Sequence, residues 1–404
     1  MTRPILIIGA GPAGLMAAEI LASAGHAVEI HDAMPSPARK FLMAGRGGLN
    51  LTHSEPLDRF ITRYGAARPF MDPLVRAFTP AHLRDWCHGL GVETFVGSSG
   101  RVFPKSFKAS ILLRAWLHRL SGLGVTLYTR HRWTGWADDG ALCFDTPAGP
   151  LRVTPAATIL ALGGASWPRL GSDGGWASLL AARGVPLAPF RPSNSGFDVA
   201  WSGGFLERAE GEPLKRIAIA FKERIVPGEL VVTRTGLEGG ALYALSAPLR
   251  DMIDREGRAV VHLDLKPDLT LPQVQNKLAR VPPADSLANK LRKGLTLGPP
   301  MGALIREFAG DADLGRASTL AALVKALPVP LTGQRGLDRA ISTAGGIKLS
   351  ALDANLMITA LPGTFACGEM LDWEAPTGGY LLQGCYATAM AAARGAERFL
   401  AESR

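Results

Sequence analysis

Three glycines near the N-terminus form a GxGxxG pattern, and an aspartate follows them at a spacing that suits nucleotide chemistry. Gly9 can make a tight turn, Gly11 lets a diphosphate approach the backbone, and Gly14 lets a helix pack closely on a strand. Asp32 lies 18 residues after Gly14, where a carboxylate can accept hydrogen bonds from ribose hydroxyls. The pattern predicts a dinucleotide site with contacts from Gly9, Gly11, Pro12, Ala13, Gly14 and Asp32.

Two strands and one helix are needed to position these residues, and the hydrophobic pattern predicts all three. Residues 4–8 are apolar and end at a glycine, which is typical of a buried parallel strand. A helix is expected over 12–24 with its N-terminus toward the phosphates, and a second strand over 27–31. An ordinary strand–turn–helix unit is the alternative, but the combination with an acid is far more specific than a lone GxGxxG.

Two more glycine pairs follow predicted strands and favour FAD over NAD. The apolar segment 157–162 runs into Gly163 and Gly164, and residues 363–366 precede Cys367 and Gly368. Gly378 and Gly379 are expected to open an alanine-rich helix up to about residue 399. Ribityl hydroxyls need an acceptor, and the flavin edge that becomes negative on reduction gains from a helix N-terminus. The expected contacts are Gly163, Gly164, Gly368, Glu369, Asp372, Gly378, Gly379 and Tyr380.

A glycine-rich loop, residues 43–52, is a further candidate for the cofactor site. Its N–H groups and Arg46 can meet the diphosphate or cover the flavin ring, while a flexible surface loop is the alternative. Asn50, Thr52 and His53 offer hydrogen bonds to the flavin edge or to a substrate, although a single histidine is more often a surface or capping residue. The expected contacts are Lys40, Gly45, Arg46, Gly47, Gly48 and Asn50.

Together these motifs resemble FAD enzymes of the glutathione-reductase-like superfamily, and within it the BaiN/RdsA-type flavoproteins, often described as NAD(P)/FAD-dependent or aminoacetone-oxidase-family proteins. The most specific block is 368–380, and other blocks lie at 40–52, 100–104, 163–168 and 343–346. The resemblance spans essentially the whole chain. It implies an α/β fold with a Rossmann-like FAD-binding domain, and an FAD-dependent oxidoreductase.

The resemblance has further implications and also limits. In similar flavoproteins a strand like the one expected over 124–132 lies by the adenine, so Trp133 is expected there, either as a contact or as a core aromatic. Leu49, Leu162 and Leu381 replace the cysteine, threonine and asparagine usual in the family, so mechanisms that need those groups do not transfer. The Trp-Glu-Ala-Pro sequence after Asp372 resembles a less characterised branch of the family, so the resemblance does not assign the substrate.

An insertion interrupts the dinucleotide-binding pattern. Residues 1–191 and 332–404 are expected to form a discontinuous FAD domain, and 192–331 an inserted substrate domain that roofs the flavin. The insertion is expected to be β-rich over 192–268 and helical over 269–331. No catalytic residue is assigned, and each of the polar candidates in the insertion is more often structural. These candidates are Arg234, Glu238 and Tyr243.

Composition limits the classes of protein. With 404 residues, 47% hydrophobic and 20% charged, the chain is globular rather than disordered or coiled-coil. The four cysteines form no CxxC pair, which argues against a zinc site or disulfide scaffold and predicts a reducing, cytoplasmic location. The apolar stretch 5–24 is similar to a signal peptide, but the GxGxxG within it favours a nucleotide site instead. We expect no metal site and no membrane association.

The net charge of +9 is concentrated in one segment of the chain. Residues 39–132 contain 15 Lys+Arg against 5 Asp+Glu, and Arg101, Lys105 and Lys108 are concentrated beside a turn. A clustered excess predicts an anionic partner near the flavin, although a solvated face without a partner is equally compatible.

The sequence therefore predicts an FAD-dependent oxidoreductase that transfers hydride through flavin N5. Because no second GxGxxG lies between strands, NADH or NADPH would dock transiently. By family resemblance, the leading function is reduction of an activated double bond in a small molecule, and the basic segment 39–132 predicts that this molecule is anionic. An RNA-modifying flavoprotein that reduces a nucleobase and a non-catalytic flavin-binding protein are the alternatives, and the oligomeric state is open.

Overall fold

The computed structural model describes residues 3–45 and 47–402 and divides them into two compact units. Unit 1 contains the residues up to 191 and from 341 onward, and unit 2 contains residues 192–340. Strands β17 (Leu327–Leu331) and β18 (Gly333–Gln334) pair with β16 (Ala259–Asp264) and β12 (Phe197–Asp198), which keeps this segment in unit 2. Arg46, a predicted cofactor contact, lies outside the described residues.

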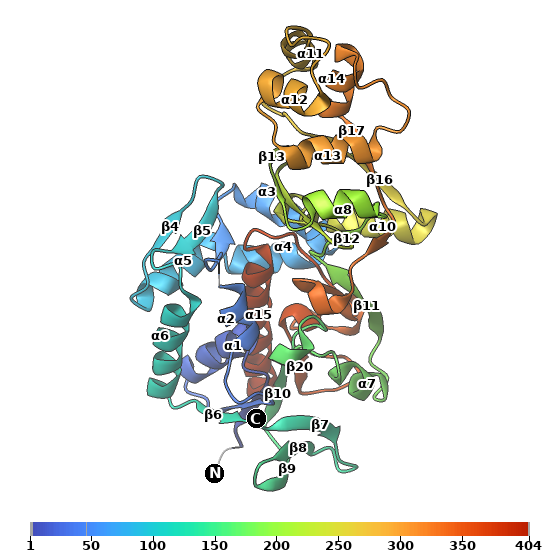
Figure 1. The fold of residues 1–404 in the computed structure, drawn as a ribbon. Coiled ribbons are helices and arrows are strands. Elements are labelled where there is room, and N and C mark those ends of the chain that lie inside the picture. Colours follow the sequence, from blue (N-terminus) through green and yellow to red (C-terminus); the bar gives the residue numbers. More distant parts are fainter. Residues whose placement is uncertain (1–2, 46, 403–404) are drawn as a thin grey trace. The chain divides into compact units, whose positions relative to one another are not determined.

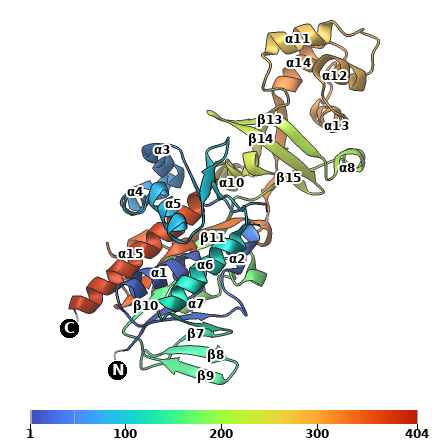
Figure 2. The same cartoon turned by 90° about the vertical axis from the view of Figure 1, so that its left-hand side faces the viewer.

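A parallel sheet forms the centre of unit 1, as the Rossmann-like prediction requires. Its apolar strands are buried, because helices cover a parallel sheet on its faces. Helix α1 (Pro12–Ser23) packs along the long helix α15 (Tyr380–Glu402), as Figures 1 and 2 show. In spatial order the strands are β20 (Thr364–Ala366), β10 (Ala157–Leu160), β1 (Ile5–Ile8), β2 (Val28–Asp32) and β6 (Thr126–Thr129).

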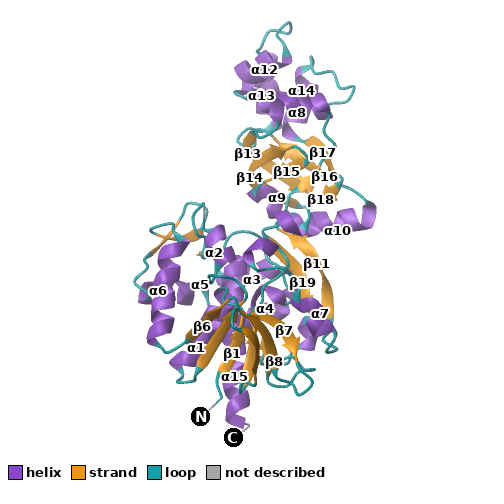
Figure 3. Ribbon diagram, turned by 60° about the horizontal axis from the view of Figure 1, so that its bottom comes forward, coloured by secondary structure: helices purple, strands orange, loops and turns teal. Residues whose placement is uncertain are grey.

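Smaller sheets and helices complete unit 1, and Figure 3 distinguishes them by colour. One small sheet contains β3 (Thr52–His53), β5 (Arg101–Pro104) and β4 (Thr94–Val96). A second contains β7 (Arg132–Trp136), β8 (Leu142–Thr146) and β9 (Gly149–Val153). In a third, β11 (Leu187–Ser193) pairs with β19 (Ser342–Ile347). The remaining helices are α2 (Arg39–Ala44), α3 (Leu57–Ile61), α4 (Arg68–Ala77), α5 (Pro80–Gly89), α6 (Ala109–Gly122) and α7 (Trp176–Ala181).

Unit 2 is built on a mostly antiparallel sheet with its own hydrophobic core. Its helices α11 to α14 gather at one end of the unit, beyond the strands (Figure 2). The remaining strands are β13 (Pro213–Phe221), β14 (Arg224–Thr233) and β15 (Gly236–Glu238), and the helices are α8 (Gly203–Ala209), α9 (Gly240–Tyr243), α10 (Ser246–Glu256), α11 (Leu271–Ala279), α12 (Leu287–Leu295), α13 (Pro299–Phe308) and α14 (Ala317–Lys325).

No helix among the described residues combines the length and the apolar character that crossing a membrane requires.

Candidate functional site

A pocket of about 280 Å³ lies in unit 1, where the carboxyl ends of β1, β2, β10 and β20 meet. Ligands bind at this edge of open α/β sheets because the loops there are free to shape a crevice. Part of the predicted cofactor contacts line the pocket: Gly9, Gly11, Pro12, Ala13, Asp32, Lys40, Trp133, Gly163, Gly368 and Glu369.

The three glycines of the N-terminal turn occupy distinct environments. Gly9 has φ +106°, a left-handed conformation that favours glycine. A β carbon on Gly14 would collide with the carbonyl oxygen of Gly9, whereas one on Gly11 would meet no atom within 4 Å. Gly14 is therefore needed for packing. Gly11 leaves open space beside the first turn of α1, whose N–H groups no side chain caps.

Asp32 is held at the end of β2 by two backbone donors. Its carboxylate accepts hydrogen bonds from the N–H groups of Ala10, at 2.6 Å, and Met34, at 2.7 Å. Burial raises the pKa of Asp32, although these bonds and the charge of Arg39 act in the opposite direction. The carboxylate thus braces the glycine turn and also faces the pocket.

A polar network connects four segments at one wall of the pocket. The Nζ atom of Lys40 lies 2.7 Å from both Oε2 of Glu369 and Oγ of Ser166. The other carboxylate oxygen of Glu369 accepts from the N–H of Thr343, whose hydroxyl accepts from the N–H of Ala165. A buried carboxylate held this way is fixed in position, because each of its bonds would be costly to break.

Two histidines that line the pocket contact each other. The Nδ1 atoms of His31 and His131 are 3.0 Å apart, so one ring donates a proton and the other accepts it. Burial, and then the neighbouring His131, lower the pKa of His31 from 6.5 to about 4. His31 is therefore neutral at ordinary pH and packs among the rings of Tyr128, His131 and Phe144.

Three buried polar atoms in pocket-lining residues have no hydrogen-bond partner among the described residues. They are Nε of Arg39, Nε1 of Trp133 and Oγ of Ser172, whereas Nε2 of His31 lies 3.5 Å from Oε2 of Glu29. An unsatisfied buried polar atom costs about 1–3 kcal/mol, so such a group of atoms fits a polar ligand better than an empty core. Together with the open space at Gly11, they fit the nucleotide half of FAD.

The other predicted contacts lie outside this pocket. Gly379, with φ +93°, rests directly against the backbone of Thr52, so the start of α15 packs on the glycine-rich loop. The amide of Asn50 donates to the carbonyls of Thr52 and Val102 and shapes that loop. Burial, and then the charge of Glu374, raise the pKa of Asp372. Those outside the pocket are Gly14, Gly45, Gly47, Gly48, Asn50, Gly164, Asp372, Gly378, Gly379 and Tyr380.

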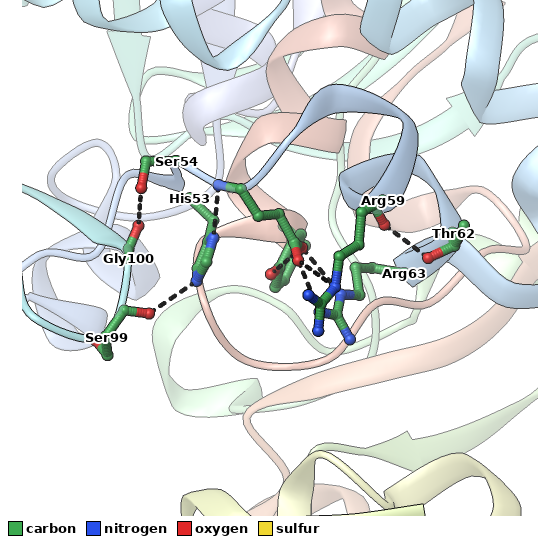
Figure 4. A network of polar contacts seen from close by, with 9 residues as sticks. His53, Ser54, Arg59, Thr62, Arg63, Ser99 and Gly100 are labelled. Carbon is green, nitrogen blue, oxygen red and sulfur yellow. Dashed lines mark hydrogen bonds and ion pairs between the residues drawn. The ribbon is translucent and has the colours of Figure 1, made fainter.

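A second polar cluster surrounds the buried carboxylate of Glu55, which contacts Tyr380 at the start of α15. Figure 4 labels Arg59, Arg63 and His53 of this cluster. Arg63 donates two bonds to it, at 2.9 and 2.7 Å, Arg59 lies 3.3 Å away, and the hydroxyl of Tyr380 donates at 2.5 Å. Burial opposes ionisation, but the bonds from Arg63 and Tyr380 outweigh it and hold the pKa of Glu55 below its usual value. His53 stacks on the ring of Tyr380.

Several residues of these clusters were not predicted from the sequence. His31, Arg39 and Ser172 line the pocket, and Glu55 and Arg63 fix Tyr380. The position of His31 directly before Asp32 at the strand end was a usable signal. Glu55 carried none, because its partner Tyr380 lies 325 positions away.

Comparisons with known proteins agree with the Rossmann-like sheet and glycine turn described above. Residues 3–395 match the family described as HI0933-like protein Rossmann domain. The 3-dehydro-bile acid delta(4,6)-reductase of Clostridium scindens is 26% identical, covering 96% of this chain and 98% of the relative. The ribosomal RNA dihydrouridine synthase of Haemophilus influenzae is 23% identical, covering 96% and 97%.

A solved structure shares the fold. The 3-ketosteroid delta1-dehydrogenase of Sterolibacterium denitrificans superposes with a TM-score of 0.55 at 12% identity, covering 99% of this chain and 100% of that one. The family match covers nearly the whole chain, and the pocket is lined by the glycine turn that the family's Rossmann domain implies. The chain therefore belongs to the HI0933-like family of FAD-dependent Rossmann oxidoreductases.

Proposed function

We propose that this protein uses NADH or NADPH to reduce an activated carbon–carbon double bond in a small anionic molecule. The family supplies the FAD-dependent chemistry, and the relative from Clostridium scindens is named as a reductase of a bile acid. When bound, FAD supplies a centre that accepts hydride and passes it to carbon. The protein's task is to hold that centre and to control charge and water around it.

The observation that carries the proposal is the pocket between the glycine turn and Glu369. Gly11 and the first turn of α1 would receive the diphosphate, and Asp32 the ribose. The ammonium group of Lys40 pairs with the carboxylate of Glu369, so the two side chains fix the wall beside Gly368 without adding net charge to it. Phe41, Leu162 and Leu179 add apolar surface that excludes water.

Tyr380, outside the pocket and beside the glycine-rich loop, is suited to holding a proton. Burial, and then its bond to Glu55, raise the pKa of its hydroxyl, so the phenol stays protonated at neutral pH. Its ring is fixed by His53 and Phe60, and its carbonyl accepts from the hydroxyl of Tyr64. Because this proton is already donated to Glu55, the hydroxyl oxygen is left to accept a hydrogen bond from a ligand, and the immobile ring helps to keep water out.

The experiment is anaerobic reduction of the flavoprotein by NADH and NADPH, followed by addition of α,β-unsaturated carboxylic acids and ketones. Reduction by at least one nicotinamide, and reoxidation by an unsaturated acid but not by its saturated analogue, would support the proposal. A flavin that neither nicotinamide reduces would favour a non-catalytic flavin-binding protein. Reoxidation by oxygen alone would point to an oxidase.

Reduction of a nucleobase in RNA is the second candidate. A relative is named as a ribosomal RNA dihydrouridine synthase, and the basic segment 39–132 carries exposed aromatic rings. Mass mapping of modified bases in RNA from cells lacking the gene tests this candidate. A base that loses two hydrogens in the deletion strain would support it, and an unchanged map would contradict it.

A further inference from the structure

Three phenylalanines form a surface cluster on the small β3–β5–β4 sheet of unit 1. Figure 1 labels two strands of this sheet, β4 and β5. The rings of Phe95 and Phe103 are stacked with centroids 5.9 Å apart, and Phe107 meets Phe95 at 5.1 Å and Phe103 at 5.6 Å. Phe95 and Phe103 are half-buried, and Phe107 is 48% exposed. We call these three residues the phenylalanine platform.

The backbone at Phe107 is unusual for a bulky residue. Its φ is +58°, a left-handed conformation that side chains with a β carbon rarely adopt. The turn is held by the bond from the Phe107 N–H to the carbonyl of Pro104, and the Phe107 carbonyl accepts from the N–H of Leu49. A strained position that leaves half of an aromatic ring in solvent gains little from core packing, which points to a functional use of the ring.

Basic side chains surround the platform. Arg101 precedes Phe103 by two residues on β5, so both side chains lie on the same face of the sheet. Lys105 forms an ion pair with Glu93, so the charge predicted there is largely compensated. Arg101 and Lys108 have no side-chain partner among the residues that the structure describes. Their two charges are free to meet an anion.

The platform borders the glycine-rich loop. A β carbon on Gly48 would lie 3.0 Å from the ring of Phe107, and Leu49 and Leu51 donate backbone bonds to Phe107 and Val102. This loop contains predicted flavin contacts. A ligand on the platform would therefore lie beside the loop that the proposed function places at the cofactor.

We propose that the phenylalanine platform, with Arg101 and Lys108, binds a single-stranded segment of RNA. Exposed rings stack on unpaired bases of any sequence, and the guanidinium and ammonium groups neutralise neighbouring phosphates. Rings and unpaired cations on one surface suit a base that carries a phosphate better than an apolar partner, which would leave both charges unmatched. The inference rests on the second candidate function, reduction of a nucleobase in RNA, and adds the surface that holds the strand.

Fluorescence anisotropy of the holoprotein with a labelled, uridine-rich single-stranded RNA tests this proposal. Phe107→Asn removes the ring and keeps a residue that tolerates positive φ. It is expected to weaken binding roughly 5- to 100-fold, the range for losing one stacked base. Arg101→Gln/Lys108→Gln is expected to lower the slope of log affinity against log salt by about 1.4, the value for two phosphates on a single strand.

Ile225→Asn is the matched control, because Ile225 is an exposed apolar residue of unit 2, at 72%. It is expected to bind RNA like the wild type. Wild-type affinity in both platform variants would overturn the proposal, and so would displacement of the RNA by NADPH, which would assign the surface to the electron donor. RNA binding by a protein that no nicotinamide reduces would contradict the proposed function and leave the platform intact.

Discussion

Lys40 and Glu369 lie 329 positions apart in the sequence, yet their side chains meet at 2.7 Å in the wall of the pocket. The carboxylate is buried and the ammonium group is partly exposed. Ser166 and Thr343 complete the contacts of the pair. This arrangement fixes one charge of each sign beside Gly368, so both residues are expected to matter for folding as well as for cofactor binding.

Lys40→Met should destabilise the apoprotein by about 2 kcal/mol, because it leaves the Glu369 carboxylate buried without its cation. Urea unfolding measures the loss. The double variant Lys40→Met/Glu369→Gln should lose less than the sum of the single variants, since the remaining groups are neutral. Strict additivity would show that the two side chains do not interact.

Gly11→Ala and Gly14→Ala should behave differently although each adds a single methyl group. Gly11 has space for a β carbon and an extended backbone, so the apoprotein should keep its stability while FAD affinity falls at least tenfold. Gly14→Ala forces helix α1 away from the Gly9 carbonyl and should lower stability by about 1–3 kcal/mol. Thermal unfolding and FAD titration separate the two effects, and similar results for both variants would refute the assigned roles.

His31 should make stability depend on pH. Its pKa in the folded protein is about 4, below the ordinary 6.5, so the unfolded chain binds the proton first as the pH falls. Its contribution is complete above about pH 6.5 and is lost toward pH 4. Between pH 7 and 4.5 the wild type should lose roughly 2 kcal/mol more than His31→Phe. If the free energies of unfolding of the two proteins changed equally with pH, the result would contradict the lowered pKa of His31.

Cys367 and Cys385 line the pocket but should not act as a redox pair. Burial raises the pKa of Cys367 to about 12, and burial also raises the pKa of Cys385, so neither is a thiolate at neutral pH. Cys367→Ser/Cys385→Ser should keep the rate of flavin reduction within a few-fold, as stopped-flow absorbance would measure. Loss of reduction in a variant that retains FAD would show that a thiol participates.

The local signals in the sequence predicted the strands and the helix around the glycine turn well. The apolar run before Gly9, the alanine-rich helix after it and the acid at Asp32 are each determined by neighbours in the chain. The strands at 5–8, 28–32, 157–160 and 364–366 confirm that pattern. Periodicity and turn chemistry suffice for such elements, because each is specified by a few adjacent residues.

Local sequence patterns could not predict the contacts between segments that are far apart in the chain. The bonds of Glu55 to Tyr380 and of His31 to His131 depend on topology that no local pattern encodes. Lys105 was expected to belong to a basic cluster that attracts an anion, but strand pairing brings Glu93 to it. The end of the insertion was expected after residue 331, but β18 pairs with β12 and keeps residues up to 340 in unit 2.

Identification of the nucleotide released from the purified protein on denaturation tests the central claim most directly. We predict FAD at one equivalent per chain, because the pocket offers both the Gly11–Asp32 end and the Glu369 end to an extended cofactor. Asp32→Ala should weaken FAD binding by about 1.5–3 kcal/mol, the scale of a lost charged hydrogen bond. Release of FMN or NAD instead, or a colourless protein that FAD cannot reconstitute, would contradict the account.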